Sequence, residues 1–279
     1  MPRTSSISST EPTRQVGGLY VQVKGKPQAF PLTHTEVTAK IAGNLSRVEV
    51  TQTFTNPFTE PLEAVYVFPL PDQAAVDDME IRIGDRTIKG NIKPREEAQQ
   101  IYEQAKREGR TAGLLEQERD NVFTQSLANI CPGEQIDVTI RYTDSLKFEA
   151  GNYEFVFPMV VGPRYIPGTP IAGTLDTDQV PDAGRISPPV LPANTRSGHD
   201  ISVTVDINAG VPITSVESTS HKLKIESIDA GVRVQLAGGD TIPNKDLILR
   251  YQVAGEQTQA TVLQQADDRG GHFALYLIP

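Results

Sequence analysis

Cysteine and tryptophan are nearly missing from this 279-residue chain, which has one cysteine, Cys131, and no tryptophan. A single cysteine excludes an intrachain disulfide, and with it the class of small secreted domains that disulfides hold together. Acidic residues also outnumber basic ones: the chain has 26 Lys and Arg and 35 Asp and Glu, which gives a formal net charge of −9. A protein that binds nucleic acid needs a basic surface to displace counterions, so this charge argues against a nucleic-acid partner.

Long apolar runs are missing as well. No run approaches the ~18 residues of a membrane-spanning helix, so the sequence predicts no membrane span. Residues 1–15 are rich in Ser, Thr and Pro and lack the apolar core of a signal peptide. They are too polar to join a core and are predicted to form a disordered tail. Together with the lack of disulfides, this favours a cytoplasmic location.

Alternation of apolar and polar residues with a period of two dominates the rest of the chain, which is the pattern of half-buried strands. The clearest stretches are residues 48–54, 136–142, 153–157, 201–207, 247–253 and 273–277. Gly84-Asp85 suits a two-residue hairpin turn, and Pro132-Gly133 suits a type II turn. The predicted fold class is therefore mainly β, an antiparallel β-sandwich with a second β-rich C-terminal portion.

One segment, residues 94–108, has helical periodicity instead. Its apolar residues follow the spacing i, i+3, i+4, i+7, at Ala98, Ile101, Tyr102 and Ala105. Pro94 suits a first helical turn, and Gly109 is placed to end the helix. We expect one amphipathic helix packed on a sheet, with Ile101 as its central anchor.

The composition also divides the chain. Residues 169–199 belong to a stretch rich in proline and glycine, which is typical of an irregular connection. We therefore expect a main domain at 16–168, this connection, and C-terminal strands at 200–279 that complete the domain and lead towards whatever follows.

A search for catalytic motifs finds no convincing set of residues. Cys131 is the sole thiol, but it opens a Pro-Gly turn, and the four histidines are far apart in sequence. A hydrolase that uses Cys131 stays open as an alternative, below the non-enzymatic interpretation. The sequence calls for no cofactor.

Two acidic patterns suggest cation binding without satisfying its rules. Asp176, Asp178 and Asp182 lack the glycine and the glutamate that complete a calcium loop. Asp200, Ser202 and Thr204 spell D-x-S-x-T, but these residues fall inside a predicted strand and not at its end. A cation-dependent adhesion unit that uses loop carboxylates is the second alternative, and no metal site is predicted.

Three segments within residues 48–168 carry a family resemblance: VTQTFTNPFTEPLEAVYVFPLP at 50–71, MEIRIGDRTIKGNIKPREEAQQIYEQAKREGRTAGLLEQERDNVFTQSLANICPGE at 79–134 and YEFVFPMVVGPRYIPG at 153–168. In this order they resemble the vault protein inter-alpha-trypsin (VIT) domain. The family includes inter-alpha-trypsin inhibitor heavy chains and vault poly(ADP-ribose) polymerase, and in most members a von Willebrand factor type A domain comes next. No such domain lies within these residues.

The resemblance implies a non-catalytic role in protein–protein interaction or scaffolding, as one module of a larger protein that also carries a type A domain. The expected partner is another protein or the adjoining type A domain. Arginine and aromatic side chains are favoured as interface anchors. The residues we single out for partner binding are Lys106, Arg107 and Arg110 at the helix exit, and Arg164 with Tyr165 in a proline-bounded loop.

Overall fold

A computed structural model of the chain describes residues 20–23, 26–29, 32–119, 121–159, 169, 171, 177–179, 198–253 and 258–278. Strands dominate these residues, and they include one helix, so the predicted mainly β fold is confirmed. The predicted tail at 1–15, and most of the predicted connection at 169–199, lie outside the described residues. The predicted boundaries between domains therefore stay predictions.

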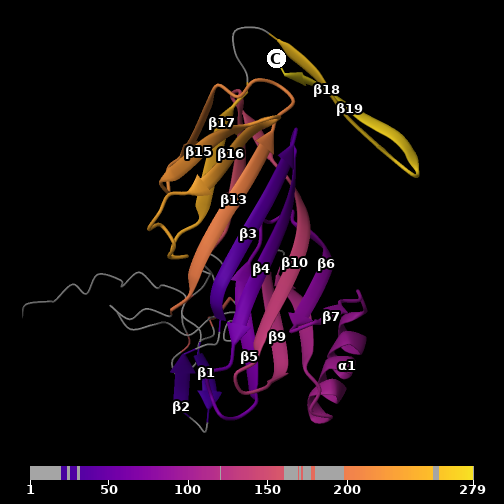
Figure 1. The fold of residues 1–279 in the computed structure, drawn as a ribbon, viewed down its shortest axis with the longest axis vertical. Helices are drawn as coiled ribbons and strands as arrows, with labels where there is room; N and C mark the ends of the chain where they lie inside the picture. The colour runs from indigo at the N-terminus through magenta and orange to yellow at the C-terminus, as the bar shows by residue number, and fades with distance from the viewer. Residues whose placement is uncertain are drawn as a thin grey trace, which may run out of the picture.

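The largest sheet has eight strands in the order β15-β16-β13-β3-β4-β10-β6-β7 (Figure 1). Their bounds are β3 Leu32–Ala42, β4 Leu45–Thr55, β6 Ala75–Ile83, β7 Arg86–Lys89, β10 Gln135–Ser145, β13 Asp200–Asn208, β15 Leu223–Ile228 and β16 Gly231–Leu236. Neighbours run antiparallel except β13 and β3, which pair parallel from Asp200↔His34 to Asn208↔Ala42. The C-terminal portion is thus joined to the same sheet as the strands that begin at residue 32.

Alternation along β4 explains why this sheet has one buried face and one solvent-exposed face. Val48, Val50 and Phe54 are buried, while Glu49 and its alternate neighbours point outward. The outward side chains pair across strands. Arg141 of β10 donates to Glu49 of β4 at 2.5 Å and to an aspartate of β6 at 2.6 Å. The outer face is therefore covered by polar cross-strand pairs, and the inner face supplies the core.

Two smaller sheets cover the inner face. One has the order β5-β9-β8 and the other β11-β12-β17-β14. Their bounds are β5 Leu62–Pro69, β8 Ala112–Arg119, β9 Val122–Ile130, β11 Lys147–Glu149, β12 Asn152–Phe157, β14 Ser215–Ser218 and β17 Leu247–Gln252. The first lies at the lower end of the molecule in Figure 1 and β17 at the upper end. Buried residues of all three sheets form one continuous hydrophobic cluster.

Two further hairpins form two-stranded sheets of their own. The first joins β1 (Tyr20–Val23) to β2 (Lys26–Ala29), and the second joins β18 (Gln259–Asp267) to β19 (Gly270–Ile278). Both predicted turns are confirmed: Gly84 has φ +56 between β6 and β7, and Gly133 has φ +70. In the second turn the amide of Glu134 donates to the carbonyl of Cys131 at 3.1 Å, the hydrogen bond that often closes a type II turn.

Helix α1 spans Arg95–Arg107, within the predicted range, and lies against β8. It ends where Gly109 adopts φ +72 and the next amide donates to the carbonyl of Ala105. The expectation that Ile101 anchors the helix is wrong, because its side chain is 52% exposed. Tyr102 is the anchor: it is 5% exposed and packs in a small cluster with residues of β8 and β9. The helix is rotated so that the larger, amphipathic ring lies against the sheet.

Candidate interaction surfaces

The cationic surface predicted from the sequence consists of Lys106, Arg107 and Arg110, at the C-terminal end of α1. The ammonium of Lys106 donates to Glu63 of β5 at 2.6 Å, and the same carboxylate accepts a hydrogen bond from Tyr102 at 3.2 Å. Lys106 is therefore held by an intramolecular ion pair.

Arg110 is also paired within the chain, at 2.6 Å from Glu108. Hydrogen bonds from Gln104 and Arg110 hold the pKa of the Glu108 carboxyl below its usual value. No ion pair of Arg107 is found among the described residues, so it is the member of the surface best able to offer its charge to a partner. Arg164 and Tyr165 lie outside the described residues. The assignment of these five residues to an interface stays a prediction.

Asn129 of β9 shapes this surface although the sequence analysis did not single it out. It has φ +55, a left-handed conformation, and its amide nitrogen donates to the carbonyls of Lys106 and Arg110, each at 3.0 Å. A side chain from a neighbouring strand thus satisfies carbonyls at the end of the helix. Asn tolerates this backbone conformation better than most residues, but nothing local to Asn129 in the sequence reveals a contact with a helix about 20 residues earlier.

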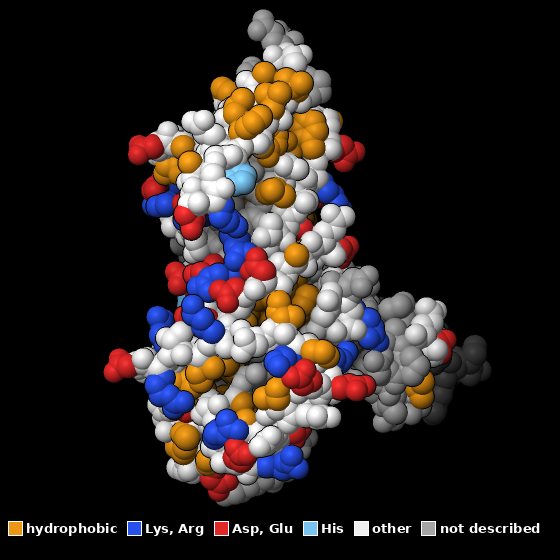
Figure 2. All heavy atoms as spheres, turned by 90° about the vertical axis from the view of Figure 1, so that its right-hand side faces the viewer, with side chains coloured by type: hydrophobic (Ala, Val, Ile, Leu, Met, Phe, Trp, Pro, Cys, Tyr) orange, Lys and Arg blue, Asp and Glu red, His pale blue; other side chains and the backbone are white. Residues whose placement is uncertain are grey.

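A more distinctive surface lies on the hairpin formed by β18 and β19, and sequence reasoning missed it. Four large apolar side chains are exposed on it: Val262 by 53%, Phe273 by 78%, Leu275 by 59% and Leu277 by 67%. The register pairs Val262 with Leu275 and places residues 273, 275 and 277 on the same side of β19, so all four share one face. We call these four residues the apolar face of the hairpin. In Figure 2 hydrophobic side chains gather over this end of the molecule.

The opposite face of the hairpin contacts the body of the molecule around Thr261 and Tyr276. The Tyr276 hydroxyl lies 3.1 Å from the Asn44 side-chain oxygen, at the turn between β3 and β4. A β-carbon added to Gly43 would lie 2.4 Å from the Tyr276 ring, and one added to Gly210 would lie 2.8 Å from Thr261. Both glycines therefore allow a close approach of the hairpin, and its apolar face is directed away from the body.

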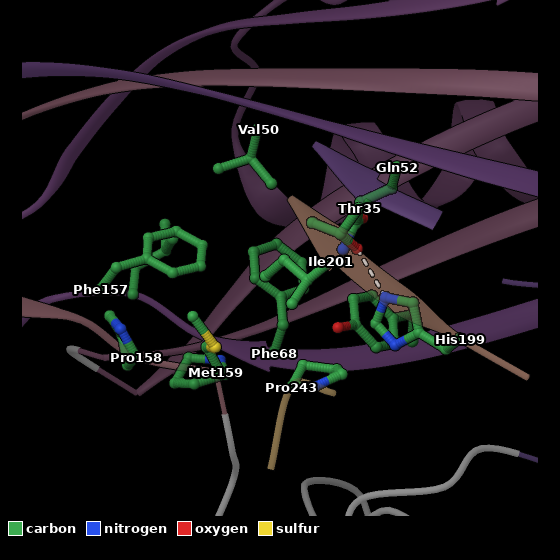
Figure 3. Close-up of a pocket in the computed structure, with 13 residues that line it drawn as sticks. Thr35, Val50, Gln52, Phe68, Phe157, Pro158, Met159, His199, Ile201 and Pro243 are labelled. Carbon is green, nitrogen blue, oxygen red and sulfur yellow. Dashed lines mark hydrogen bonds between the residues drawn. The ribbon is translucent and has the colours of Figure 1, made fainter. Parts of the chain in front are cut away.

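A small, partly open pocket lies between β3, β4, β5, β13 and the end of β12 (Figure 3). Its volume of about 20 Å³ suits one water molecule and not a metabolite. Gln52 borders it and has a buried side-chain oxygen without a hydrogen-bond partner. On the same wall the His199 ring lies 2.8 Å from the Thr35 hydroxyl, and burial lowers the pKa of His199 to about 4. His199 is therefore neutral near pH 7.

The outer face of the same strands carries a chain of polar contacts. His34 Nδ1 lies 2.6 Å from Asp200, and its Nε2 lies 3.3 Å from the Ser202 hydroxyl. Ser202 is exposed on this face, whereas the cavity in Figure 3 opens on the other side of β13. In the described part of the chain, the side-chain hydrogen bond found for Ser202 is the one to His34. The D-x-S-x-T letters lie inside β13, as expected from the sequence.

The remaining motif residues of the sequence analysis are Cys131 and the aspartates at 176, 178 and 182, and we assign no function to them. Cys131 is exposed in its turn, where its sulfur lies 3.8 Å from the carbonyl of Asn129. Asp178 accepts a hydrogen bond from the amide of Thr169, while the other two aspartates of that stretch fall outside the described residues. No group of three or more metal-ligating side chains is found in the described part of the chain. Within the same residues, no helix combines the length and apolarity needed to cross a bilayer.

The fold and these surfaces define a mainly β module with one packed helix and an exposed apolar hairpin. Residues 32–142 match the family model of the vault protein inter-alpha-trypsin domain, so this part of the chain is a VIT domain. The resemblance found in the sequence is thereby confirmed.

Three relatives illustrate the range of proteins that contain similar residues. The chain is 28% identical to protein mono-ADP-ribosyltransferase PARP4 of Mus musculus over 76% of its own length and 10% of that protein. It is 32% identical to von Willebrand factor A domain-containing protein 5A of Rattus norvegicus over 51% of its length and 18% of that protein. It is 30% identical to inter-alpha-trypsin inhibitor heavy chain H3 of Mesocricetus auratus over 43% of its length and 14% of that protein.

The chain thus spans between 10% and 18% of the length of these relatives, in which the similar region is one module of a longer protein. Among solved structures, the M1 zinc metallopeptidase from Deinococcus radiodurans aligns with a TM-score of 0.38 and 12% identity, over 86% of this chain and 45% of that one. So distant a likeness transfers no function to this chain.

Proposed function

We propose that this chain works as a non-catalytic protein–protein interaction module within a larger protein, and that the apolar face of the hairpin is its main docking surface. The observation that carries the proposal is the exposure of four large apolar side chains on one face of β18 and β19. Contiguous apolar surface of this kind is typical of sites that another protein covers.

The energetics of the hairpin support this proposal. A two-stranded hairpin is at best marginally stable by itself. Here one face contacts the body around Thr261 and Tyr276, while the apolar face is exposed to solvent. Covering the apolar face would remove roughly 400 Å² of apolar surface from water, on the order of 10 kcal/mol before the costs of association are subtracted. A partner surface would therefore stabilise the hairpin as well as bind it.

The cationic surface of Lys106, Arg107 and Arg110 is a second proposed contact, directed at an acidic protein surface such as an adjoining type A domain. It is weaker than the apolar face because two of its three cations already have glutamate partners. We place the module in the cytoplasm, since a chain with one cysteine gains nothing from an oxidising compartment.

Hydrogen–deuterium exchange tests whether the apolar face is covered in the full-length protein or in a complex with a protein partner. Amide exchange in β18 and β19 is measured in this chain at 2 µM and in the full-length natural protein at the same concentration, with β4 as an internal reference. We expect the hairpin amides to exchange at least tenfold more slowly in the full-length protein, or in either sample once a protein partner binds. Equally fast exchange in the full-length protein, with and without partner, would refute docking at this face.

A further inference from the structure

The hairpin of β18 and β19 meets the body of the molecule along a short part of its length. It projects from the upper end of the molecule in Figure 1, and most of its described side chains are exposed. Three half-buried ones, Thr261, Leu263 and Tyr276, lie on the side opposite the apolar face. Asp267 is half-buried as well, at the tip, where it pairs with Arg269 of the same hairpin. Thr261 and Tyr276 are partners in the register, so the contact with the body centres on one residue pair.

The body contacts Tyr276 through Gly43 and Asn44, in the turn between β3 and β4. Gly43 has φ +59, and the Tyr276 ring occupies the space that a side chain at Gly43 would need, because an added β-carbon would overlap the ring. The Tyr276 hydroxyl donates to the Asn44 side-chain oxygen at 3.1 Å, the one hydrogen bond found between hairpin and body in the described part of the chain. Glycine therefore allows both the left-handed turn and the close approach of an aromatic ring.

The same turn is held in place by contacts from three other segments. The Gly43 amide donates to the carbonyl of Asn208, at the end of β13, at 3.0 Å, and the amide of Leu146 donates to the Asn44 carbonyl at 2.8 Å. The hydroxyl of the buried Tyr251, on β17, lies 3.5 Å from the Gly43 carbonyl oxygen. None of these contacts involves the hairpin, so the turn keeps its shape whether or not the hairpin is attached.

We infer that Tyr276 anchors the hairpin to the turn of Gly43 and Asn44, and that the hairpin detaches as a unit when this contact is lost. A two-stranded hairpin is at best marginally stable by itself, so detachment also loosens its strand pairing. Leu275 and Leu277 flank Tyr276 and point to the other side of β19, so the anchor fixes the direction of the apolar face. This inference goes beyond the proposed function, because it does not depend on what covers that face.

Hydrogen–deuterium exchange of the 279-residue chain tests the anchor, with the amides of β18 and β19 as the readout and those of β4 as the reference. Gly43→Ala places a methyl group where the Tyr276 ring lies, so the hairpin amides should exchange roughly tenfold faster or more. Gly84→Ala is the matched control. Gly84 has a similar φ, +56, but an added β-carbon would meet nothing within 4 Å, so this variant should leave hairpin exchange unchanged.

A double variant separates loss of the anchor from strain in the turn. Tyr276→Thr removes the ring while keeping a residue that suits a strand, and it should speed hairpin exchange as much as Gly43→Ala does. Once the ring is absent, adding Gly43→Ala should cause no further change. Tyr276→Phe keeps the ring and loses the hydrogen bond to Asn44, so hairpin exchange should rise less than in Tyr276→Thr.

Unchanged exchange in β4 confirms that the body of each variant is folded. The inference is overturned if the hairpin amides of the unsubstituted chain already exchange as fast as those of an unstructured peptide. It is also overturned if Tyr276→Thr leaves hairpin exchange unchanged, which decides the matter even where Gly43→Ala does not fold. An equal effect of Gly43→Ala with and without the ring would assign that effect to strain in the turn and would overturn it as well.

The outcome is separate from that of the proposed function. If these variants show no anchor while the hairpin is protected in the full-length protein, the inference fails and the proposed function stands. If the anchor is confirmed and the full-length protein gives no protection, the proposed function fails and the inference stands.

Discussion

Helix α1 provides a sharp test of how this fold is held together, because two adjacent apolar residues have opposite environments. Tyr102 is 5% exposed and contacts Leu114 and Ala128, whereas Ile101 is 52% exposed. Truncating a buried aromatic side chain costs about 3–5 kcal/mol. Tyr102→Ala should reduce the free energy of unfolding by that amount, since it also removes the hydrogen bond to Glu63.

Ile101→Ala should cost less than about 1 kcal/mol. Half of the side chain is already in water, and alanine has the higher helix propensity, which offsets part of the loss. Tyr102→Phe separates the ring from the hydroxyl and should cost about 0.5–1.5 kcal/mol, the usual value of one hydrogen bond. Urea denaturation followed by circular dichroism at pH 7 measures all three variants. If Ile101→Ala proves more destabilising than Tyr102→Ala, the orientation of the helix described here is wrong.

Three further predictions concern other parts of the molecule. Gly231→Ala should lower the free energy of unfolding by more than about 3 kcal/mol, or prevent folding. Gly231 has a φ of +130, and the new β-carbon would lie 1.9 Å from the backbone oxygen of Ile207. The yield of folded protein and a urea titration measure this loss. Burial lowers the pKa of His199 to about 4, so the unfolded chain binds this proton more readily than the folded protein as pH falls from 6.5 towards 4. The contribution of His199 to the free energy of unfolding should therefore decrease over this range, by at most about 1.4 kcal/mol per pH unit. His199→Gln should reduce the pH dependence of the free energy of unfolding between pH 6.5 and 5, measured by urea denaturation. An unchanged slope in this variant would contradict the burial of the His199 ring. Reversing all three charges of the cationic surface should weaken binding to an acidic partner domain supplied in trans and reduce the salt dependence of that binding. An unchanged melting temperature shows that the variant is folded. Unchanged affinity of such a variant at low salt would mean that these three side chains are solvated and bind no partner.

Much of the fold could be predicted because its signals are local. The period-two alternation in β4 and β10 follows from backbone geometry, which sends successive side chains to opposite faces whatever the rest of the chain does. The turns at Gly84 and Gly133 depend on the backbone freedom of one residue each. The limits of α1 likewise follow from spacing and from the glycine that ends it.

The sites were harder to predict, since their properties depend on contacts between distant residues. The partners of Lys106 and Arg110 lie on β5 and on the helix exit, and the sequence offers several glutamates that could serve equally well. Arg95, at the other end of the helix, pairs with Glu116 and Glu118 of β8, at 2.9 Å and 2.8 Å. Choosing among such partners requires the orientation of the helix on its sheet.

By itself, the sequence determined that this chain forms strands with one amphipathic helix, where its turns fall, and which family its central residues resemble. The tertiary structure decided which residue anchors the helix, that β13 pairs in parallel with β3 more than 150 residues earlier, and which face of the last hairpin is left in water. Alternation places Phe273, Leu275 and Leu277 on one face of β19, but it does not say whether that face is buried or left in water. Periodicity follows from the geometry of neighbouring residues, whereas burial depends on which distant segments pack against them.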